Sequence, residues 1–190
     1  MNNYYESIEG WFTASDKTIY DMAVQKFSSG SIFVEIGSFK GRSSVAMAVE
    51  IINSNKDIEF YCVDTWDGSA EHQSGQPFED KDVVNKNLFN IFLQNTEPVK
   101  HVITPIRKSS LEAVNNFEDE SITFLFLDAA HDYENVKKDL NAWKSKVKKG
   151  GLLAGHDWTW ESVRSAASEF AEENNLPISA VNNVWGIQIQ

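Results

Sequence analysis

Cysteine, proline and long apolar runs are scarce in this 190-residue sequence, which contains one cysteine and four prolines. The lone cysteine, Cys62, excludes an internal disulfide and is typical of a protein in a reducing compartment. The longest strongly apolar runs, Phe124–Leu127 and Leu152–Ala154, are far shorter than the ~20 residues of a transmembrane helix. The first residues include neither a basic nor an apolar region, so we expect no signal peptide. We therefore expect a cytoplasmic protein without a membrane partner.

Basic side chains are also few, with 17 Lys and Arg against 28 Asp and Glu, which gives a formal net charge of −11. Affinity for a nucleic-acid backbone needs clustered Lys and Arg, so the sequence predicts no nucleic-acid partner. The lysines at 144, 146, 148 and 149 come directly before two glycines. We interpret them as the solvated end of a helix, because cations and a following glycine are favoured there.

The length and composition predict one domain that covers residues 1–190, since a domain averages ~150 residues and 42% of the chain is apolar. We divide it into an N-terminal helical segment (1–30), a core (31–157) and a last helix with a hairpin (158–190). Ser15 is expected to cap the N-terminal helix, and the last helix is expected to start near Thr159.

Short apolar runs alternate with longer segments of helical periodicity. Continuous apolar runs without strict alternation are typical of parallel strands that are covered on both faces. Five such strands are predicted, at Ser31–Ile36, Glu59–Asp64, Lys100–Thr104, Ile122–Asp128 and Gly151–Gly155. The tail predicts two more strands, Pro177–Val181 and Val184–Ile189, joined by a tight turn. The fold class is therefore α/β: a doubly wound, Rossmann-like, seven-stranded and mostly parallel sheet with a C-terminal antiparallel hairpin and helices on both faces.

The first strand ends in a loop that contains Gly37 and Gly41 and then enters a helix. It is not a dinucleotide fingerprint, because Phe39 and Arg42 stand where that pattern needs glycine, and no Gly-Lys-Ser/Thr of a P-loop follows. The acid Glu35 favours a ligand that carries positive charge. The alternative is an ordinary turn between strand and helix with a partly exposed glutamate.

Other ionisable side chains stand where later strands end. Asp64 ends the second strand, at a distance from the glycine loop that suits hydrogen bonds to ribose hydroxyls. Asp128 and His131 follow the fourth strand, and His156 and Asp157 follow the fifth. Because ligands of such folds bind at the carboxyl ends of the strands, these side chains are expected to meet at one rim.

Four motifs occur in order: E-I-G-S-F-K-G-R-S from Glu35, V-D-T-W-D-G from Val63, L-D-A-A-H-D-Y from Leu127 and K-G-G-L-L-A-G-H-D from Lys149. Together they resemble a class I S-adenosylmethionine-dependent methyltransferase. More narrowly, the sequence is similar to a small bacterial and phage branch with a D-x-x-H-x-Y motif, related to antibiotic-sugar O-methyltransferases. The resemblance implies transfer of a methyl group to an oxygen of a small molecule or sugar.

The resemblance also implies which residues bind S-adenosylmethionine. Glu35 and Gly37 would hold the methionine end, Asp64 the ribose, and Ser110 would lie beside the adenine. The full implied set is Glu35, Gly37, Ser38, Gly41, Ser43, Asp64, Thr65, Trp66, Ser110 and Asp128. Trp66 has an alternative role, as a plug at the edge of the sheet.

An alcohol or phenol acceptor must lose a proton during methyl transfer, and histidine is the usual base near neutral pH. The catalytic candidates are Asp128, His131 and His156. Related enzymes bind Mg²⁺ through acids that match Asp128 and Asp157. Here His156 stands in place of a further acid and is the third candidate metal ligand. An imidazole with carboxylates suits Mn²⁺, Fe²⁺ or Zn²⁺ better than Mg²⁺ and requires a bend after the fifth strand. The alternative for His131 is a structural hydrogen bond to the region of Asp157.

Two pairs of residues have two interpretations each. Trp158 and Trp160 either line an acceptor site or pack the last helix. Glu71 and His72 belong either to a solvated face or to a lid formed by residues 67–82. A cap over the site would be short or would come from a second subunit of a homo-oligomer. Two alternative functions are a cofactor-binding protein without transferase activity and a metal-dependent, hydroxylase-like enzyme.

Overall fold

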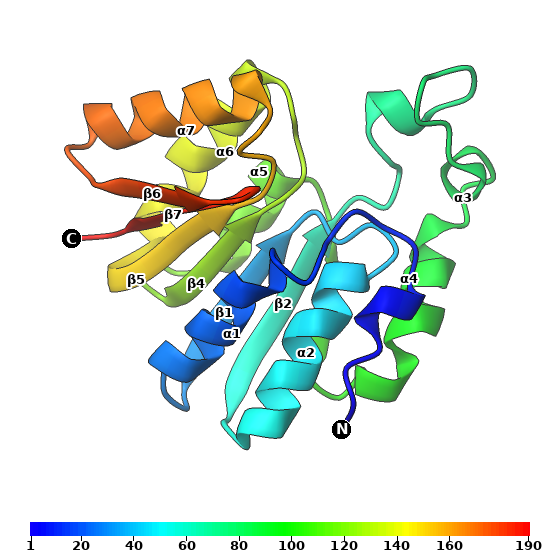
Figure 1. Cartoon of the computed structure of the whole chain (residues 1–190), viewed down its shortest axis with the longest axis horizontal. Coiled ribbons are helices and arrows are strands. Elements are labelled where there is room, and N and C mark those ends of the chain that lie inside the picture. Colours follow the sequence, from blue (N-terminus) through cyan, green and yellow to red (C-terminus); the bar gives the residue numbers. More distant parts are fainter.

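A computed structural model describes residues 1–190 and shows one seven-stranded sheet in the order β3-β2-β1-β4-β5-β7-β6 (Figure 1). Strands β1 to β5 are parallel, and β7 runs antiparallel to both β5 and β6. This confirms the predicted fold class, including the C-terminal hairpin. None of the helices combines the length and the apolar character needed to span a bilayer.

The strands are β1 (Ser31–Ile36), β2 (Ile58–Asp64), β3 (Ile103–Arg107), β4 (Ile122–Leu127), β5 (Val147–Gly155), β6 (Ile178–Val181) and β7 (Val184–Gln188). The helices are α1 (Lys17–Lys26), α2 (Arg42–Ser54), α3 (Lys81–Val84), α4 (Leu88–Thr96), α5 (Ser110–Ala113), α6 (Tyr133–Trp143) and α7 (Glu161–Glu173). The long connection between β2 and α3 contains one turn of 3-10 helix, Ala70–His72.

Two apolar cores lie on opposite faces of the sheet, because successive side chains of a strand point to opposite sides. In β4, Phe124 and Phe126 belong to the core beneath α1, α2 and α4, whereas Leu125 and Leu127 belong to the core beneath α5, α6 and α7. All six residues of β4 are buried. Figure 1 shows the two groups of helices on either side of the sheet.

Several predicted boundaries were wrong. Strand β3 begins at Ile103 rather than Lys100, because a 3-10 turn over Glu97–Val99 precedes it. Strand β5 begins at Val147, so Lys148 and Lys149 lie in a strand and do not end a helix. The register shift between β4 and β5 explains why this first part of β5 lacks the apolar pattern of a buried strand.

The start of α1 also differs from the prediction. Asp16, not Ser15, precedes the first helical residue. The carboxylate of Asp16 accepts hydrogen bonds from both the backbone N–H and the hydroxyl of Thr13, at 2.8 and 2.6 Å. Asp16 therefore fixes the entry into the helix while its side chain is 2% exposed.

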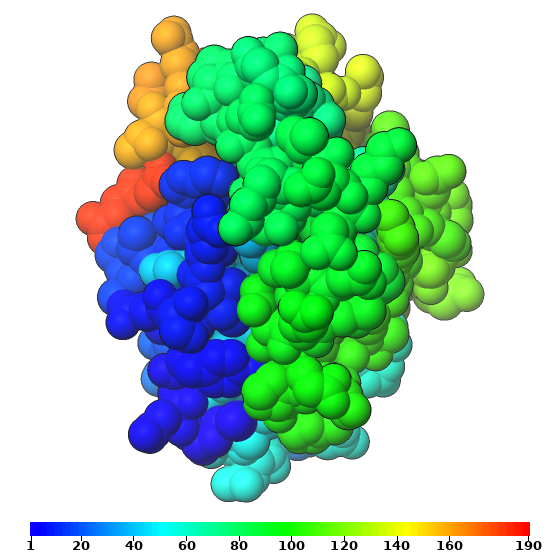
Figure 2. Space-filling model, turned by 90° about the vertical axis from the view of Figure 1, so that its right-hand side faces the viewer, coloured from blue at the N-terminus to red at the C-terminus, as the bar shows by residue number.

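The strand order reverses between β1 and β4, which both border the crevice where ligands of such sheets bind. The N-terminal segment lies beside α4: the hydroxyl of Tyr4 donates to the backbone oxygen of Asn95 at 3.0 Å. Figure 2 shows these N-terminal residues (blue) against the green α4 region, with the connection that follows β2 above them (teal).

Candidate active site

The loop after β1 packs directly against the loop after β4. Gly37 has a φ of +88°, and a Cβ there would lie 2.0 Å from the backbone oxygen of Asp128. At Gly41, with a φ of +89°, a Cβ would lie 3.0 Å from Thr96 and 3.1 Å from Phe92. The space beside each glycine is thus occupied by protein atoms, so these glycines first of all allow the loop to pack. Any contact with a ligand must come from the loop's other atoms.

Glu35 is fully buried beneath this loop. Its Oε1 accepts a hydrogen bond from the hydroxyl of Tyr20 at 2.8 Å, and its Oε2 accepts hydrogen bonds from Ser38, at 2.8 Å, and from Ser44. Burial raises the pKa of Glu35, while the hydroxyl donors counteract part of that rise. Because both oxygens bond to protein hydroxyls, Glu35 ties α1, β1 and α2 together below the crevice.

Asp64 fixes the upper part of the same loop. Its Oδ2 accepts hydrogen bonds from the backbone N–H groups of Ser38 and Phe39 at 2.8 and 2.9 Å. Its Oδ1 accepts one from the N–H of Trp66 at 2.7 Å. The carboxylate is half-buried, so the end of β2 and the loop after β1 form one unit.

Two other residues of the implied cofactor set, Trp66 and Ser110, are engaged with protein. Trp66 is 1% exposed, its ring lies 4.7 Å from both Phe89 and Phe92, and its Nε1–H donates to the backbone oxygen of Phe39. The buried ring has no free face for the adenosine, so the expected contact between Trp66 and the adenosine is wrong. Trp66 instead fills space within the protein, as in its alternative role. The hydroxyl of Ser110 accepts a hydrogen bond from Trp143 at 2.8 Å.

The remaining two residues of that set lie beside the loops. Ser43 is 6% exposed in the first turn of α2. Thr65 follows β2 and is half-buried, and its hydroxyl accepts a hydrogen bond from the N–H of Asp67 at 3.2 Å.

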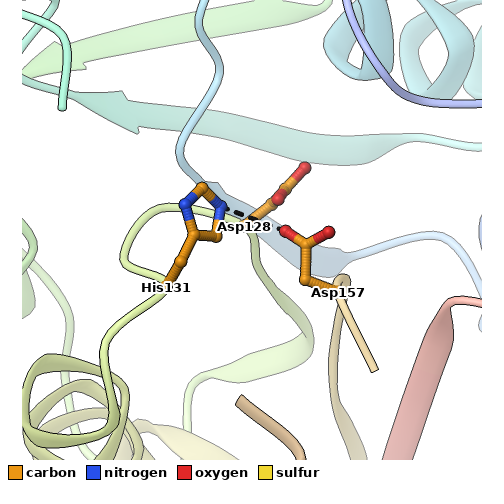
Figure 3. A group of neighbouring side chains, drawn as sticks. All are labelled: Asp128, His131 and Asp157. Carbon is orange, nitrogen blue, oxygen red and sulfur yellow. Dashed lines mark ion pairs between the residues drawn. The ribbon is translucent and has the colours of Figure 1, made fainter. Parts of the chain in front are cut away.

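Asp128, His131 and Asp157 meet at the carboxyl ends of β4 and β5 (Figure 3). One potential ligand atom from each lies within 4.8 Å of the others. The Nε2 atom of His131 lies 3.0 Å from Oδ2 of Asp157. The hydrogen bond to Asp157 that the sequence left as an alternative for His131 is thus present.

His156 lies behind this group and is 4% exposed. Its Nδ1 is 3.3 Å from Asp157 Oδ1 and 3.5 Å from Asp128 Oδ1, and its Nε2 is 3.3 Å from Asp16 Oδ2. The bend required after β5 exists, since Asp157 has a φ of +57°. His156 therefore bridges three carboxylates, and the imidazole grouped with Asp128 and Asp157 as a potential ligand is His131 rather than the expected His156.

The carboxylates change the pKa values of both imidazoles. Burial by itself would lower the pKa of His131, but Asp157 and Asp128 raise it to about 9. For His156 burial has the same effect, and Asp128 and Asp157 raise the pKa to about 12. Burial would raise the pKa of Asp157, yet the two imidazoles hold it well below its usual range. The carboxylates therefore favour the protonated form of both imidazoles.

The partners of Glu71 and His72 in the long connection were not predicted from the sequence. Glu71 Oε1 lies 2.9 Å from His131 Nδ1, and His72 is 8% exposed with its ring stacked on Trp11 at 5.5 Å. The interpretation of this pair as a solvated face is therefore wrong. The only local signal was the position of an acid beside a histidine in a segment without periodicity.

Lys40 is a further unforeseen element of the site. It is 2% exposed, and its Nζ atom lies 2.8 Å from Glu9, 2.7 Å from Asp80 and 2.9 Å from Asp82. The carboxylates raise the pKa of Lys40 although burial opposes this. Lys40 thus joins the loop after β1 to the N-terminal segment and to the end of the long connection.

The tryptophans near α7 differ in their surroundings. Trp160 is 43% exposed, and its ring centroid lies 4.9 Å from that of His131. Trp158 is partly buried against the core beneath α6 and α7. Trp160 is therefore the one that offers a free aromatic face beside the rim.

The donor atoms of Asp128, Asp157 and His131 fit a divalent cation. Two carboxylates and one imidazole suit Mn²⁺ or another transition metal better than Mg²⁺, which prefers oxygen ligands alone. His131 also has its other nitrogen on the carboxylate of Glu71, an arrangement that orients metal-binding histidines in many proteins.

Comparisons with known proteins agree with this architecture. The sequence model of a family described as a methyltransferase domain matches residues 34–158. An uncharacterized protein of Sinorhizobium fredii, y4gI, is 25% identical over 124 residues. The match covers 65% of this chain but only 13% of that relative's length.

Solved structures share the fold. The O-methyltransferase NovP superposes with a TM-score of 0.71 at 13% identity, covering 95% of this chain and 83% of NovP. The SAM-dependent O-methyltransferase TM0748 of Thermotoga maritima has a TM-score of 0.63 at 10% identity, covering 96% and 68%. Fibrillarin of Aeropyrum pernix, solved with natively bound S-adenosyl-L-methionine, has a TM-score of 0.55 at 14% identity, covering 84% and 66%.

Proposed function

The chain belongs to the methyltransferase domain family, and on that premise we propose that it transfers a methyl group from S-adenosylmethionine to an oxygen of a small molecule or sugar. The observation that carries the proposal is the rim at the crevice, where Asp128, His131 and Asp157 lie beside the loop after β1. This is the edge of the sheet at which a ligand of a doubly wound fold binds.

The charge of the rim supports a cationic cofactor. Four carboxylates contact the two imidazoles, so the group stays negative even with both imidazoles protonated; they belong to Asp16, Glu71, Asp128 and Asp157. When bound, S-adenosylmethionine would supply an electrophilic methyl group on a sulfonium. Asp128 is the proposed partner of that positive charge, and Asp64 the proposed partner of the ribose through its remaining lone pairs.

His131 is the proposed base, although its carboxylate neighbours favour the protonated imidazole. A cation bound beside Asp128 and Asp157 would compete for their charge and lower the pKa of His131 toward neutrality. Its Nε2 could then accept the proton of the acceptor's hydroxyl group. His156 would remain protonated and hold the carboxylates of Asp128 and Asp157 in place.

A divalent cation is the other proposed means of activating the acceptor. Asp128, Asp157 and His131 would hold it, with Mn²⁺ preferred over Mg²⁺. A bound metal ion lowers the pKa of a coordinated hydroxyl group, so a separate base is then needed less. Metal analysis of the purified protein, followed by chelation and a methyl-transfer assay, distinguishes activation by His131 as a base from activation by a bound metal ion.

Calorimetry with S-adenosylhomocysteine tests the proposed function. We expect one site per chain, and absence of binding at millimolar ligand would contradict the proposal. On a true acceptor, D128A and H131A should each lose most of their turnover, and full turnover in both variants would overturn the catalytic assignment. Binding without transfer to any hydroxylated acceptor would instead favour the cofactor-binding alternative.

A further inference from the structure

Glu71, in the connection between β2 and α3, forms a side-chain hydrogen bond with His131 at the rim. It lies in the 3-10 turn Ala70–His72, 60 positions before His131. Its Oε1 is 2.9 Å from Nδ1 of His131, and the two side chains are 28% and 23% exposed. Glu71 and His131 are thus half-buried against each other rather than solvated.

The other contacts of His131 involve other atoms, so Glu71 is the partner of its Nδ1 atom. Its Nε2 faces Asp157 at 3.0 Å, the ring of Trp160 lies against it, and its backbone oxygen accepts a hydrogen bond from Ser162 at 2.5 Å. A histidine with one nitrogen held by a carboxylate keeps its proton there, which leaves the other nitrogen for chemistry. In this site the other nitrogen is Nε2, which faces Asp157 and becomes available for chemistry when it loses its proton.

The connection that carries Glu71 is anchored by two residues that follow it, His72 and Asp80. His72 stacks on Trp11, and its ring centroid lies 5.3 Å from that of Phe39. Further along, Asp80 pairs with the buried Lys40, and its backbone N–H donates to the backbone oxygen of His72 at 3.0 Å. Glu71 is therefore held at the rim by a packed segment, and it leaves the rim whenever that segment leaves.

We propose that Glu71 is a positioning residue for His131: it accepts the Nδ1–H hydrogen bond, fixes the ring orientation and directs Nε2 toward Asp128 and the acceptor. The proposal rests on the proposed function, because it assigns Glu71 a part in that same site. It makes residues 67–82 a component of the catalytic site and not only a cover, since His131 is oriented only when this segment is docked.

Nitrogen-15 NMR of the histidine side chains in the full chain tests the proposal directly. Four histidines are present, and H131Q identifies the His131 signals by their disappearance. In wild-type protein we expect a protected Nδ1–H of His131. E71A should lose this signal, and E71Q should keep it, because the amide oxygen of glutamine can still accept the hydrogen bond.

E79A is the matched control. Glu79 is an exposed acid of the same segment, and it bonds the backbone N–H of Gly75 rather than His131. E79A should therefore leave the His131 signals unchanged. A protected Nδ1–H in E71A, or its loss in E79A and E71A alike, would overturn the proposal.

Failure of this inference and failure of the proposed function can be told apart. The NMR measurement needs no cofactor or acceptor, whereas calorimetry with S-adenosylhomocysteine tests the cofactor site independently of Glu71. Wild-type protein that binds S-adenosylhomocysteine but shows no effect of E71A on His131 contradicts only the role of Glu71. Loss of the His131 signal in E71A together with absence of binding in wild-type protein contradicts only the methyltransferase proposal.

Discussion

His131 and Asp157 are joined by a contact of 3.0 Å between Nε2 and Oδ2, across the ends of β4 and β5. Neither residue belongs to a regular strand or helix, and each also contacts a further charged group. This pair is the centre of a chain of ionic contacts that runs from Asp16 through His156 to Glu71. These ionic contacts connect the start of α1, the rim and the long connection after β2.

The pairing of His131 makes stability depend on pH. Its pKa is raised from 6.5 to about 9 in the folded protein, so the folded state binds a proton that the unfolded chain releases between these values. The stabilisation is complete below pH 6.5 and is lost as the pH rises through 9. We expect the free energy of unfolding to fall over this window by up to about 1.4 kcal/mol per pH unit for this group.

Urea unfolding at intervals from pH 6.5 to 9 measures this slope. H131Q should reduce it, whereas H101Q should not, because His101 is exposed in the turn before β3. A wild-type stability that stays constant across the window would contradict the ionic role of His131.

Gly37 should be far less tolerant of a side chain than another glycine with similar backbone angles. Gly37 and Gly30 have φ values of +88° and +79°, but a Cβ at Gly30 meets nothing within 4 Å, and one at Gly37 meets Asp128 at 2.0 Å. G30A should cost about 1 kcal/mol for the backbone conformation alone. G37A should cost about 3 kcal/mol or more, or prevent folding. Equal unfolding midpoints in urea for the two variants would contradict the close approach of the two loops.

Lys40 should hold the long connection in place. Removing one partner of a buried ion pair leaves an uncompensated charge, so we expect K40M to lower the free energy of unfolding by about 3 kcal/mol. We also expect faster proteolytic cleavage within residues 67–82. K81M, which replaces an exposed lysine of the same region, is the control and should behave like wild type. Unchanged cleavage in K40M would contradict this role of Lys40, because the other contacts would then hold the connection in place without it.

Asp64 should be needed for cofactor binding. D64A removes the acceptor of three backbone N–H groups, on Ser38, Phe39 and Trp66, as well as the proposed partner of the ribose. We expect at least a tenfold loss of affinity for S-adenosylhomocysteine in calorimetry, about 1.4 kcal/mol. D57A removes an exposed carboxylate before the opposite end of β2 and should bind like wild type. Wild-type affinity in D64A would contradict a role of Asp64 in the cofactor site.

The sequence predicted the sheet because its central strands carry a strong local signal. Every residue of β4 is buried between two layers of helices, and such a strand appears in a sequence as a continuous apolar run. The signal failed where burial is incomplete. Lys148 and Lys149 at the start of β5 are partly or fully exposed, so their strand conformation is set by pairing with neighbours and not by their own apolar character.

By itself the sequence determined that Asp64, Asp128, His131 and Asp157 stand at the ends of parallel strands, because strand periodicity and chain order fix that edge. Only the tertiary structure decided how they pair. The contact between Glu71 and His131 spans 60 positions, and Asp16 reaches His156 from the position before α1. Such pairings depend on how loops pack over the sheet, and no local periodicity encodes them. The positions of the acids follow from the sequence, whereas the ionic contacts that raise the pKa of both imidazoles follow from the fold.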